Sequence, residues 1–394
     1  MHILHVYKDY APVLGGIENH IRLLAEGQVR RGHRVTVMVT NPKGWRTEEE
    51  VLNGVRVIRA SRLATVASAP ISVSLAWSMR RLSCDVVHAH FPYPVGEVAQ
   101  WLFAPRRVCR VLTYHSDVVR QQGWLRLYAP LMYRVLSQMD AILATSPPYA
   151  ESSPVLRRFR DRVHVVPLGI ALSRFLQAPA ERVAAWQARL TPHNTPLLLF
   201  VGRLRYYKGL DVLLRALLHV KQGTLAVVGD GPMGTAWKRL ADELGLTSRV
   251  RFLGEVPDSD LPALYHAADL FVLPASARSE AFGTVLVEAM AAGLPLITTE
   301  VGTGTSWVNQ HGITGLVVPP HDPMALANAI NTLLGAPERR EAMGEAGRRR
   351  ALEEFNAERM VERVLTIYSS RCPGGDSHED AHRSPLGRHR GKAT

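Results

Sequence analysis

Two glutamates stand eight positions apart in the stretch Ser279-Glu280-Ala281-Phe282-Gly283-Thr284-Val285-Leu286-Val287-Glu288-Ala289-Met290-Ala291-Ala292-Gly293. Leucine, methionine and alanine favour a helix over 284–292, with Thr284 as its N-cap and Gly293 as its stop. Glu280 then lies in the loop before the helix, and Glu288 lies about one turn inside it. The unpaired N–H groups of the first helical turn lie between the two carboxylates and favour an anion.

A ligand with hydroxyl groups at both ends and negative charge in the middle would fit this stretch, and a nucleotide sugar is such a ligand. We expect Glu280 to bind sugar hydroxyls and Glu288 to bind ribose hydroxyls. A solvated helix face is the ordinary alternative for two glutamates at this spacing. It is disfavoured here because the apolar neighbours of Glu288 leave almost no polar stripe. Glu288 therefore either forms a hydrogen bond with a partner in the protein or binds the ligand, and we favour ligand binding.

Length and composition indicate an ordinary globular protein of two domains. The chain has 394 residues, of which 46% are hydrophobic and 21% charged. No apolar run approaches the ~20 residues of a membrane span, and the sequence enters a strand at its start without a signal-peptide pattern. Three isolated cysteines, Cys84, Cys109 and Cys372, show no metal or disulfide spacing. They favour a reducing compartment, so we expect a cytoplasmic protein.

Positive charge is concentrated in the first half of the chain. Residues 1–170 hold 22 Lys and Arg against 12 Asp and Glu, a net charge of +10 out of +12 for the whole chain. This asymmetry favours an anionic partner, and we expect peripheral contact with an anionic membrane surface rather than with nucleic acid. Two segments have apolar side chains that would insert into the membrane interface: Trp101-Leu102-Phe103 beside Arg106-Arg107, and Trp124-Leu125 beside Arg120 and Arg126. The alternative is that these aromatic residues pack in the protein core.

Strands and helices alternate along the chain, which predicts an α/β fold with two doubly wound, parallel sheets facing a shared cleft. The expected strands are 3–7, 35–39, 55–58, 86–90, 111–114, 141–145 and 163–166 in the first half, and 197–201, 225–228, 250–253, 270–273, 295–298 and 316–318 in the second. We expect domains at 1–170 and 171–355, a last helix over 356–370, and a disordered tail at 371–394.

The loop after the strand 197–201 carries a cationic pair. Arg203 and Lys208 leave the carboxyl end of that strand, where ligands bind in open α/β sheets. We expect both to bind a diphosphate and to stabilise it as a leaving group. In the first half, Gly15 and Gly16 form the equivalent loop, and glycine allows the backbone to approach a phosphate closely.

Three histidines follow or lie on strands of the first half. His115 follows the strand 111–114, and a lone histidine is more often structural than catalytic. His88 and His90 share one face of their strand at a spacing that would suit a metal. No third ligand is visible nearby in the sequence, so we interpret them as structural.

Two further motifs have simpler explanations. The segment Gly229-Asp230-Gly231-Pro232-Met233-Gly234 fits G-x-G-x-x-G, with Glu255 in the place of a ribose-binding acid, which raises the alternative of an NAD-dependent oxidoreductase. That alternative leaves the glutamates and the cationic pair unexplained. Asp258-Ser259-Asp260 resembles a metal-binding D-x-D, but it stands where a helix begins, so we expect it to cap that helix.

As a set and in this order, these motifs resemble the family 4 retaining glycosyltransferases of the GT-B fold. The resemblance covers about residues 1–370 and rests on Gly15-Gly16, His115, Gly202-Arg203 with Lys208, and Glu280 followed by Glu288. It implies two Rossmann-like domains, the acceptor on the first and the nucleotide sugar mainly on the second, with a last helix crossing back. It also implies metal-independent chemistry without a cofactor.

Carried over by this resemblance, Arg203 and Lys208 match the diphosphate pair, and His115 matches a first-domain histidine near the donor sugar. Glu280 matches the ligand of the sugar hydroxyls, and Glu288 matches the ribose ligand. The helix start near phosphate and sugar corresponds to Phe282, Gly283, Thr284 and Val285. One departure is Gly302-Thr303-Gly304-Thr305, where many members have Gly-Gly followed shortly by Glu.

The wording of two motifs, Tyr114-His115-Ser116-Asp117 and Arg205-Tyr206-Tyr207-Lys208, is most similar to the mannosyl- and rhamnosyltransferase branch. The resemblance therefore implies transfer of a mannose- or rhamnose-like hexose to a glycan, glycolipid or lipid-linked acceptor in cell-envelope synthesis. A UDP-glucose- or UDP-N-acetylglucosamine-dependent enzyme with a soluble acceptor is the alternative. A non-catalytic sugar-nucleotide-binding protein is a third possibility, although every charged position of the pattern is filled.

Overall fold

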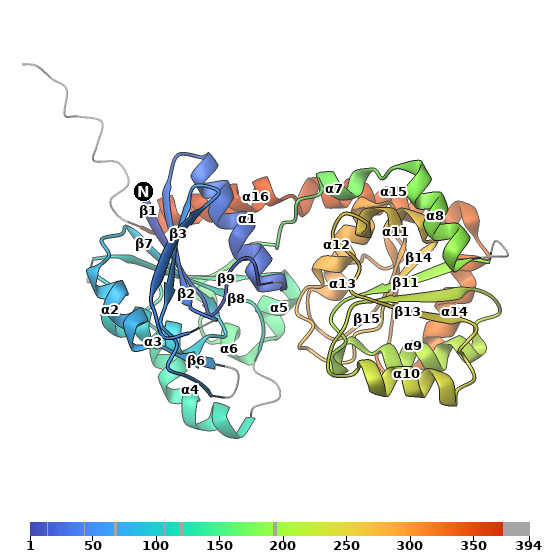
Figure 1. Cartoon of the computed structure of the whole chain (residues 1–394), viewed down its shortest axis with the longest axis horizontal. Helices are drawn as coiled ribbons and strands as arrows, with labels where there is room; N and C mark the ends of the chain where they lie inside the picture. Colours follow the sequence, from blue (N-terminus) through green and yellow to red (C-terminus); the bar gives the residue numbers. More distant parts are fainter. Residues whose placement is uncertain are drawn as a thin grey trace, which may run out of the picture.

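The computed structural model describes residues 1–13, 15–42, 44–66, 69–105, 107–117, 122–191 and 195–372. They form two lobes that lie side by side, each built around its own sheet (Figure 1). The first sheet has the order β10-β9-β8-β7-β1-β2-β4-β3, and the second has the order β13-β12-β11-β14-β15-β16. These two α/β sheets, the second parallel throughout and the first parallel except at one edge, confirm the predicted fold class.

The first lobe buries its strands between two helical layers. Its main strands are β1 (His2–Val6), β2 (Arg34–Thr40), β3 (Glu48–Leu52), β4 (Val55–Ala60), β7 (Val86–Phe91), β8 (Cys109–Tyr114), β9 (Ala141–Ala144) and β10 (Val163–Val165). Side chains alternate between the faces: Leu4 and Val6 pack with α2 (Val73–Arg81) and α3 (Pro94–Phe103), whereas Ile3 packs beneath α1 (Gly16–Arg30) and α16 (Ala357–Arg371). The remaining elements are β5 (Ala64–Val66), β6 (Ala69–Ile71), α4 (Gln122–Leu136), α5 (Pro147–Ser152) and α6 (Pro154–Arg157).

The second lobe has a single large apolar core around a fully parallel sheet. Its strands are β11 (Leu197–Val201), β12 (Thr224–Val228), β13 (Val250–Gly254), β14 (Leu270–Leu273), β15 (Leu296–Thr299) and β16 (Gly315–Val318). Its helices are α7 (Ser173–Leu176), α8 (Ala180–Leu190), α9 (Leu210–Ala216), α10 (Gly234–Glu243), α11 (Leu261–Ala267), α12 (Thr284–Ala291), α13 (Thr305–Val308), α14 (Pro323–Leu334) and α15 (Pro337–Glu354). The strands run as short continuous apolar segments because both faces of the sheet are covered.

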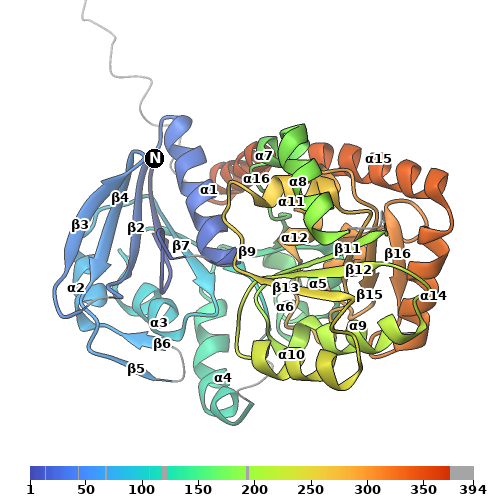
Figure 2. The ribbon, with the colours of Figure 1, turned by 45° about the vertical axis from the view of Figure 1, so that its right-hand side comes forward.

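The chain passes between the lobes twice, and the two passages are hydrogen-bonded to each other. Ile170 N–H donates to the Phe355 carbonyl at 3.0 Å, and Ala357 N–H donates to the Ile170 carbonyl at 3.1 Å. A Cβ on Gly169 would lie 2.7 Å from the Ala357 Cα, so only glycine fits this crossing. From there α16 runs back along α1 of the first lobe (Figure 2). Domain boundaries after residues 170 and 355 are kept as our proposal, which the separate sheets support.

The edge of the first sheet differs from the prediction. Strand β3 was missed, and it pairs antiparallel with β4, so this sheet is not wholly parallel. The turn between them is Asn53-Gly54, with φ of 49° and 81°. Asn-Gly between two strands is the strongest short-range hairpin signal. The exposed glutamates of β3 obscured it, because an edge strand need not show the apolar run of a buried one.

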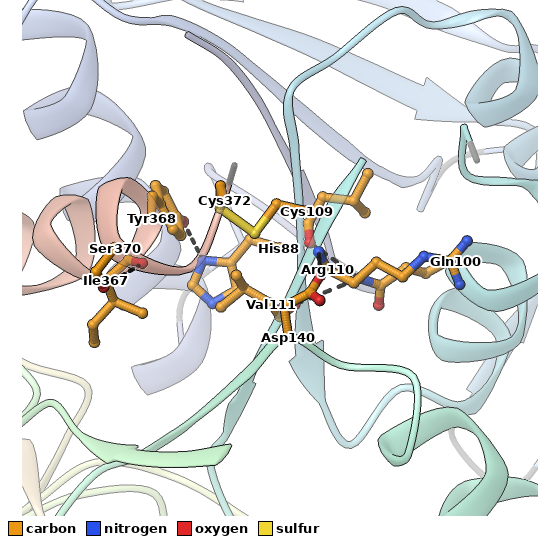
Figure 3. Close-up of a disulfide and its surroundings, with 11 residues drawn as sticks. His88, Gln100, Cys109, Arg110, Val111, Asp140, Ile367, Tyr368, Ser370 and Cys372 are labelled. Carbon is orange, nitrogen blue, oxygen red and sulfur yellow. Dashed lines mark hydrogen bonds between the residues drawn. A yellow bond between two sulfur atoms is a disulfide. The ribbon is translucent and has the colours of Figure 1, made fainter. Parts of the chain in front are cut away.

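The prediction of three isolated cysteines is wrong. Cys109, the first residue of β8, forms a disulfide with Cys372, and Cys84 is free (Figure 3). The inference of a reducing compartment therefore loses its basis. The predicted tail also begins too early, since Arg371 is the last residue of α16 and Cys372 is bonded; residues 373–394 lie outside the described residues. None of the helices formed by the described residues is long and apolar enough to cross a bilayer.

Candidate active site

The start of α12 has the geometry expected for an anion site, with one correction. Gly283 is the N-cap, in the left-handed region at φ 79°, and Thr284 is the first helical residue rather than a cap. No side chain caps the first turn, and Leu286 N–H donates to the Gly283 carbonyl at 2.9 Å. The N–H groups of Thr284 and Val285 donate to no group of the described residues and are available. Gly293, at φ 84°, ends the helix as predicted. Glu280 and Phe282 are buried in the loop that precedes it.

Lys208 and Glu280 form a buried ion pair in front of this helix. The Lys208 Nζ lies 2.6 Å from a Glu280 carboxylate oxygen, and the two side chains are 10% and 9% exposed. Gly209 brings the two loops together: it has φ 68°, and a Cβ there would lie 1.9 Å from the Pro274 carbonyl oxygen. The residues assigned separately to diphosphate and sugar are therefore direct partners, and a ligand that binds between them must meet both charges.

Glu288 lies on the next turn of α12 and is bonded to Tyr265, whose hydroxyl donates to it at 2.8 Å. Burial raises the pKa of Glu288 to about 7, against the opposing effects of the Tyr265 hydrogen bond and of the charges on Arg174 and Lys208. The structure thus shows the first of the two alternatives predicted for Glu288, a hydrogen bond to a protein partner. Ligand binding by the same carboxylate, the alternative we favoured, stays a prediction. Its second oxygen accepts no hydrogen bond from the described residues.

Arg203 faces the first lobe. Its side chain is exposed and makes no hydrogen bond or ion pair with any residue that the structure describes. Its charge nevertheless acts on Glu18 in the first turn of α1: burial raises the pKa of Glu18, while Lys8 and Arg203 lower it. Gly15 is the N-cap of that helix, and a Cβ there would lie 2.0 Å from a Glu18 carboxylate oxygen. The glycine loop at Gly15-Gly16 and the Arg203 loop therefore approach each other from opposite lobes.

His115 follows β8 as predicted and is buried. Its Nε2 lies 3.1 Å from Nδ1 of His90, and its Nδ1 has no hydrogen-bond partner within the described part of the chain. Burial holds the pKa of His115 well below its usual value, so the ring is neutral at pH 7.

The two lobes touch around Arg278, which sequence reasoning missed. Its guanidinium donates to the Gly302 carbonyl at 2.7 Å, to Ser152 Oγ at 3.0 Å and to Asp117 at 3.3 Å. Ser152 Oγ itself donates to the Gly302 carbonyl at 2.7 Å. These contacts join the segment two residues after His115 to the segment two residues before Glu280. Residues of both lobes therefore meet between the segments that carry His115 and Glu280.

Comparison with known proteins agrees with this geometry. Residues 14–174 match the family described as Glycosyltransferase Family 4, and residues 184–350 match Glycosyl transferases group 1. O-antigen chain mannosyltransferase C of Escherichia coli is 37% identical over 94% of this chain and 98% of its own length. D-rhamnosyltransferase WbpZ of Pseudomonas aeruginosa is 39% identical over 91% and 93%. The chain belongs to the family 4 glycosyltransferases.

Solved structures place this glycosyltransferase in the GT-B fold. Sucrose-phosphate synthase from Thermosynechococcus elongatus superposes with a TM-score of 0.78 at 26% identity, covering 94% of this chain and 98% of that one. WaaG, a glycosyltransferase involved in lipopolysaccharide biosynthesis, superposes with a TM-score of 0.70 at 20% identity, covering 95% and 100%, and supports the fold alone. The predicted family, its mannosyl- and rhamnosyltransferase branch, the fold and the enzyme class are confirmed.

The G-x-G-x-x-G segment of the glycosyltransferase serves loop packing. A Cβ on Gly229 would lie 2.3 Å from the Gly202 carbonyl oxygen, and one on Gly231 would lie 2.6 Å from the Leu204 carbonyl oxygen. Leu204 N–H also donates to the Asp230 carbonyl at 2.9 Å. These glycines let the loop after β12 lie directly against the Arg203 loop. This packing explains their spacing, so a dinucleotide is not needed to explain it.

Two other sequence interpretations need correction. Asp258 and Asp260 do not cap α11: they pair with Arg174 at 3.3 Å and Arg182 at 3.0 Å, and no side-chain cap bond is made.

The expectation that no third ligand lies near His88 and His90 is also wrong. The ligand nitrogens of His5 lie within 4.8 Å of those of His88 and His90, and His20, His90 and His115 form a second such group.

Proposed function

We propose that this glycosyltransferase moves a hexosyl group, with retention of anomeric configuration, from a nucleotide-diphosphate sugar to a glycan or lipid-linked acceptor of the cell envelope. The observation that carries the proposal is the Lys208–Glu280 pair at the start of α12, with Glu288 one turn further on. In this arrangement Glu280 would bind the sugar, Lys208 would bind the diphosphate and Glu288 would bind the ribose.

The donor site follows from the charges present. Arg203, Lys208 and the free N–H groups at the start of α12 would hold the diphosphate, and the two cations would stabilise the negative charge that grows on it as it leaves. We propose that these cations take the place of a metal ion in this role. The backbone and side chains around the helix start would line the phosphate and sugar: Phe282, Gly283, Thr284 and Val285.

The first lobe would complete the site. His115 would contact the donor sugar near the reaction centre, and the exposed loop at Gly15 and Gly16 would close over the diphosphate. Enclosure excludes water, which would otherwise hydrolyse the donor. Contacts of Arg278 with Asp117 and Ser152 join the two lobes and support a site completed by both.

The donor proposed is a mannose- or rhamnose-type nucleotide sugar, supported by relatives that are a mannosyltransferase and a D-rhamnosyltransferase. Incubation with GDP-mannose, dTDP-rhamnose, UDP-glucose and UDP-N-acetylglucosamine in turn, with a membrane extract as acceptor source, tests it. We expect transfer from GDP-mannose or dTDP-rhamnose into organic-extractable product, with the donor's anomeric configuration retained by NMR. Transfer only from a UDP-sugar to a water-soluble product, or an inverted product, would contradict the proposal.

We also propose that the first lobe touches an anionic membrane. Helices α2 and α3 pack together and expose Val73, Trp77, Leu102 and Phe103, and the Arg81 guanidinium lies 4.4 Å from the centre of the Trp77 ring. Of the residues named for this role from the sequence, Arg107 is exposed, whereas Arg106, Arg120 and the side chains of Trp124, Leu125 and Arg126 lie outside the described residues.

Vesicle co-sedimentation tests this contact. We expect binding that requires anionic lipid, falls as salt is raised and weakens in a Trp77→Ala/Phe103→Ala variant. Leu218→Ala, which removes an exposed apolar residue of the second lobe, is the matched control and should bind normally. Equal sedimentation with neutral and anionic vesicles would contradict an electrostatic contact.

A further inference from the structure

A row of histidines lies on one face of the first sheet, beneath α1. His5 on β1 pairs in register with His88 on β7, and His90 pairs with Thr113 on β8, two residues before His115. Because side chains alternate along a strand, these residues all point to the same face. They occupy its carboxyl end, whereas Ile3, Val86 and Val111 make the same face apolar at the other end.

Three of these rings form a continuous hydrogen-bonded chain. His115 Nε2 lies 3.1 Å from His90 Nδ1, His90 Nε2 lies 3.1 Å from His5 Nδ1, and His5 Nε2 lies 2.8 Å from the Gln28 side-chain oxygen. All four residues are buried. Burial lowers the pKa of His5 to about 4 and holds those of His90 and His115 well below their usual value, so each ring is neutral and carries one proton.

The Gln28 oxygen sets the direction of every bond in this chain. An amide oxygen only accepts, so His5 donates from Nε2 and its Nδ1 is an acceptor. His90 must then donate to it from Nε2, which leaves His90 Nδ1 to accept from His115 Nε2. The last ring nitrogen of the chain, His115 Nδ1, therefore carries a lone pair and no proton, and it has no hydrogen-bond partner among the described residues.

The inner end of the chain is Gln28 on α1, and the crossover helix α16 packs beside it. The Tyr368 hydroxyl of α16 lies 2.5 Å from His88 Nδ1, whose Nε2 lies 2.7 Å from Thr113 Oγ1. Figure 3 shows His88 and Tyr368 beside the disulfide that fastens the end of α16 to β8. The orientation of the chain thus depends on Gln28 of α1, which packs on the sheet together with α16.

A metal ion is the competing explanation for so many buried imidazoles. Bound between His20, His90 and His115, it would take one unprotonated nitrogen from each ring. The chain explains the burial of His90 and His115 without an ion. Titration with Zn²⁺ therefore separates the two explanations.

We propose that His90, His5 and Gln28 are positioning residues that hold His115 in the Nε2-protonated tautomer, so that its Nδ1 accepts a hydrogen bond from a substrate hydroxyl. The role of His115 toward the substrate rests on the function proposed above; the tautomer does not. This histidine chain differs from a histidine oriented by a carboxylate because every residue in it is neutral. It therefore places no charge beside the departing diphosphate.

Nitrogen NMR of the full-length protein labelled with ¹⁵N-histidine tests the proposal, since protonated and unprotonated ring nitrogens have separate shifts. The His115 signals are assigned by their loss in His115→Ala. In the wild type we expect Nε2 protonated and Nδ1 unprotonated across pH 6–8. Gln28→Met removes the accepting oxygen at nearly constant volume and should give a mixture of tautomers. Gln28→Glu keeps an acceptor and should restore the single tautomer.

Turnover with GDP-mannose provides the second readout. We expect kcat to fall about fivefold in Gln28→Met, as for loss of one hydrogen bond, and to recover in Gln28→Glu, with melting temperatures confirming that both variants fold. A protonated His115 Nδ1 in the wild type, or an unchanged tautomer in Gln28→Met, would overturn the proposal whatever the activity. So would one equivalent of Zn²⁺ bound by the wild type and lost in His20→Ala. Failure of the proposed function alone would leave the predicted tautomer intact.

Discussion

Binding of a nucleotide sugar should depend on pH through Glu288. Burial raises the pKa of this carboxyl from 4.5 to about 7, so most of it is neutral at pH 6. Only the carboxylate can accept hydrogen bonds from two ribose hydroxyls, so the ligand should bind the charged form more tightly and lower the pKa. Binding at pH 6 then releases a proton, and affinity must rise as pH rises through 7 and level off above 8.

The size of the effect follows from the two pKa values. If the ribose hydroxyls return the carboxyl from about 7 to its ordinary 4.5, the Kd at pH 6 should be about tenfold that at pH 8. This ratio corresponds to ~1.4 kcal/mol of binding free energy. The partly exposed side chain can reach a ligand while Tyr265 holds one of its oxygens.

Calorimetric titration with GDP-mannose at pH 6, 7 and 8 measures this dependence. The diphosphate of a nucleotide sugar does not titrate in this range, so the protein supplies the change. Glu288→Gln is the matched control, because its amide oxygen can still accept from Tyr265 but it carries no titrating proton; its affinity should be lower and independent of pH. Equal affinities at pH 6 and 8 in the wild type, or the same slope in the glutamine variant, would refute this reasoning.

Three further changes should have separable effects. Arg203→Ala should lower turnover by ~10²–10³ through loss of a preorganised cation, while Arg205→Ala, on the same loop, should stay near wild type; similar losses in both would point to general disruption of the loop. Arg278→Ala should loosen the contact between the lobes and raise the radius of gyration measured by X-ray scattering without ligand, and an unchanged value would show that this contact does not hold them. Cys372→Ser should lower the free energy of unfolding by ~2–4 kcal/mol, because the disulfide closes a long loop, and denaturant titration of this variant beside Cys84→Ser measures it.

Much of the second lobe could be predicted from local patterns. The helix α12, Glu288 within it and Glu280 before it all lie within fifteen residues, and helical geometry alone places Glu288 one turn from the helix start. The contact of Lys208 with Glu280 could not be predicted, because it depends on two loops that Gly209 allows to pack together. A spacing in sequence specifies such a pair only when both members belong to one element.

The first lobe shows the same limit in its histidines. The spacing of His88 and His90 indicated that they share one face of their strand. Their neighbours, His5 on β1 and His20 on α1, could not be predicted, because their positions depend on strand register and helix packing. Arg278 had no signal in the sequence, since two of its three partners, Asp117 and Ser152, lie on the other lobe and an arginine in a loop is usually solvated. The Asn53-Gly54 turn did carry a local signal, and it was overlooked.

The division of roles between Glu280 and Glu288 is tested most directly by comparing bare GDP with GDP-mannose in calorimetric titrations of the wild type and of the two glutamine variants. Glu280→Gln should bind GDP at least as tightly as the wild type, because the ion pair that occupies Lys208 is weakened, and should lose about tenfold or more of the affinity for GDP-mannose. Glu288→Gln should weaken both ligands alike. Equal losses of GDP binding in the two variants, or normal GDP-mannose binding in Glu280→Gln, would contradict the assignment of sugar and ribose to these carboxylates.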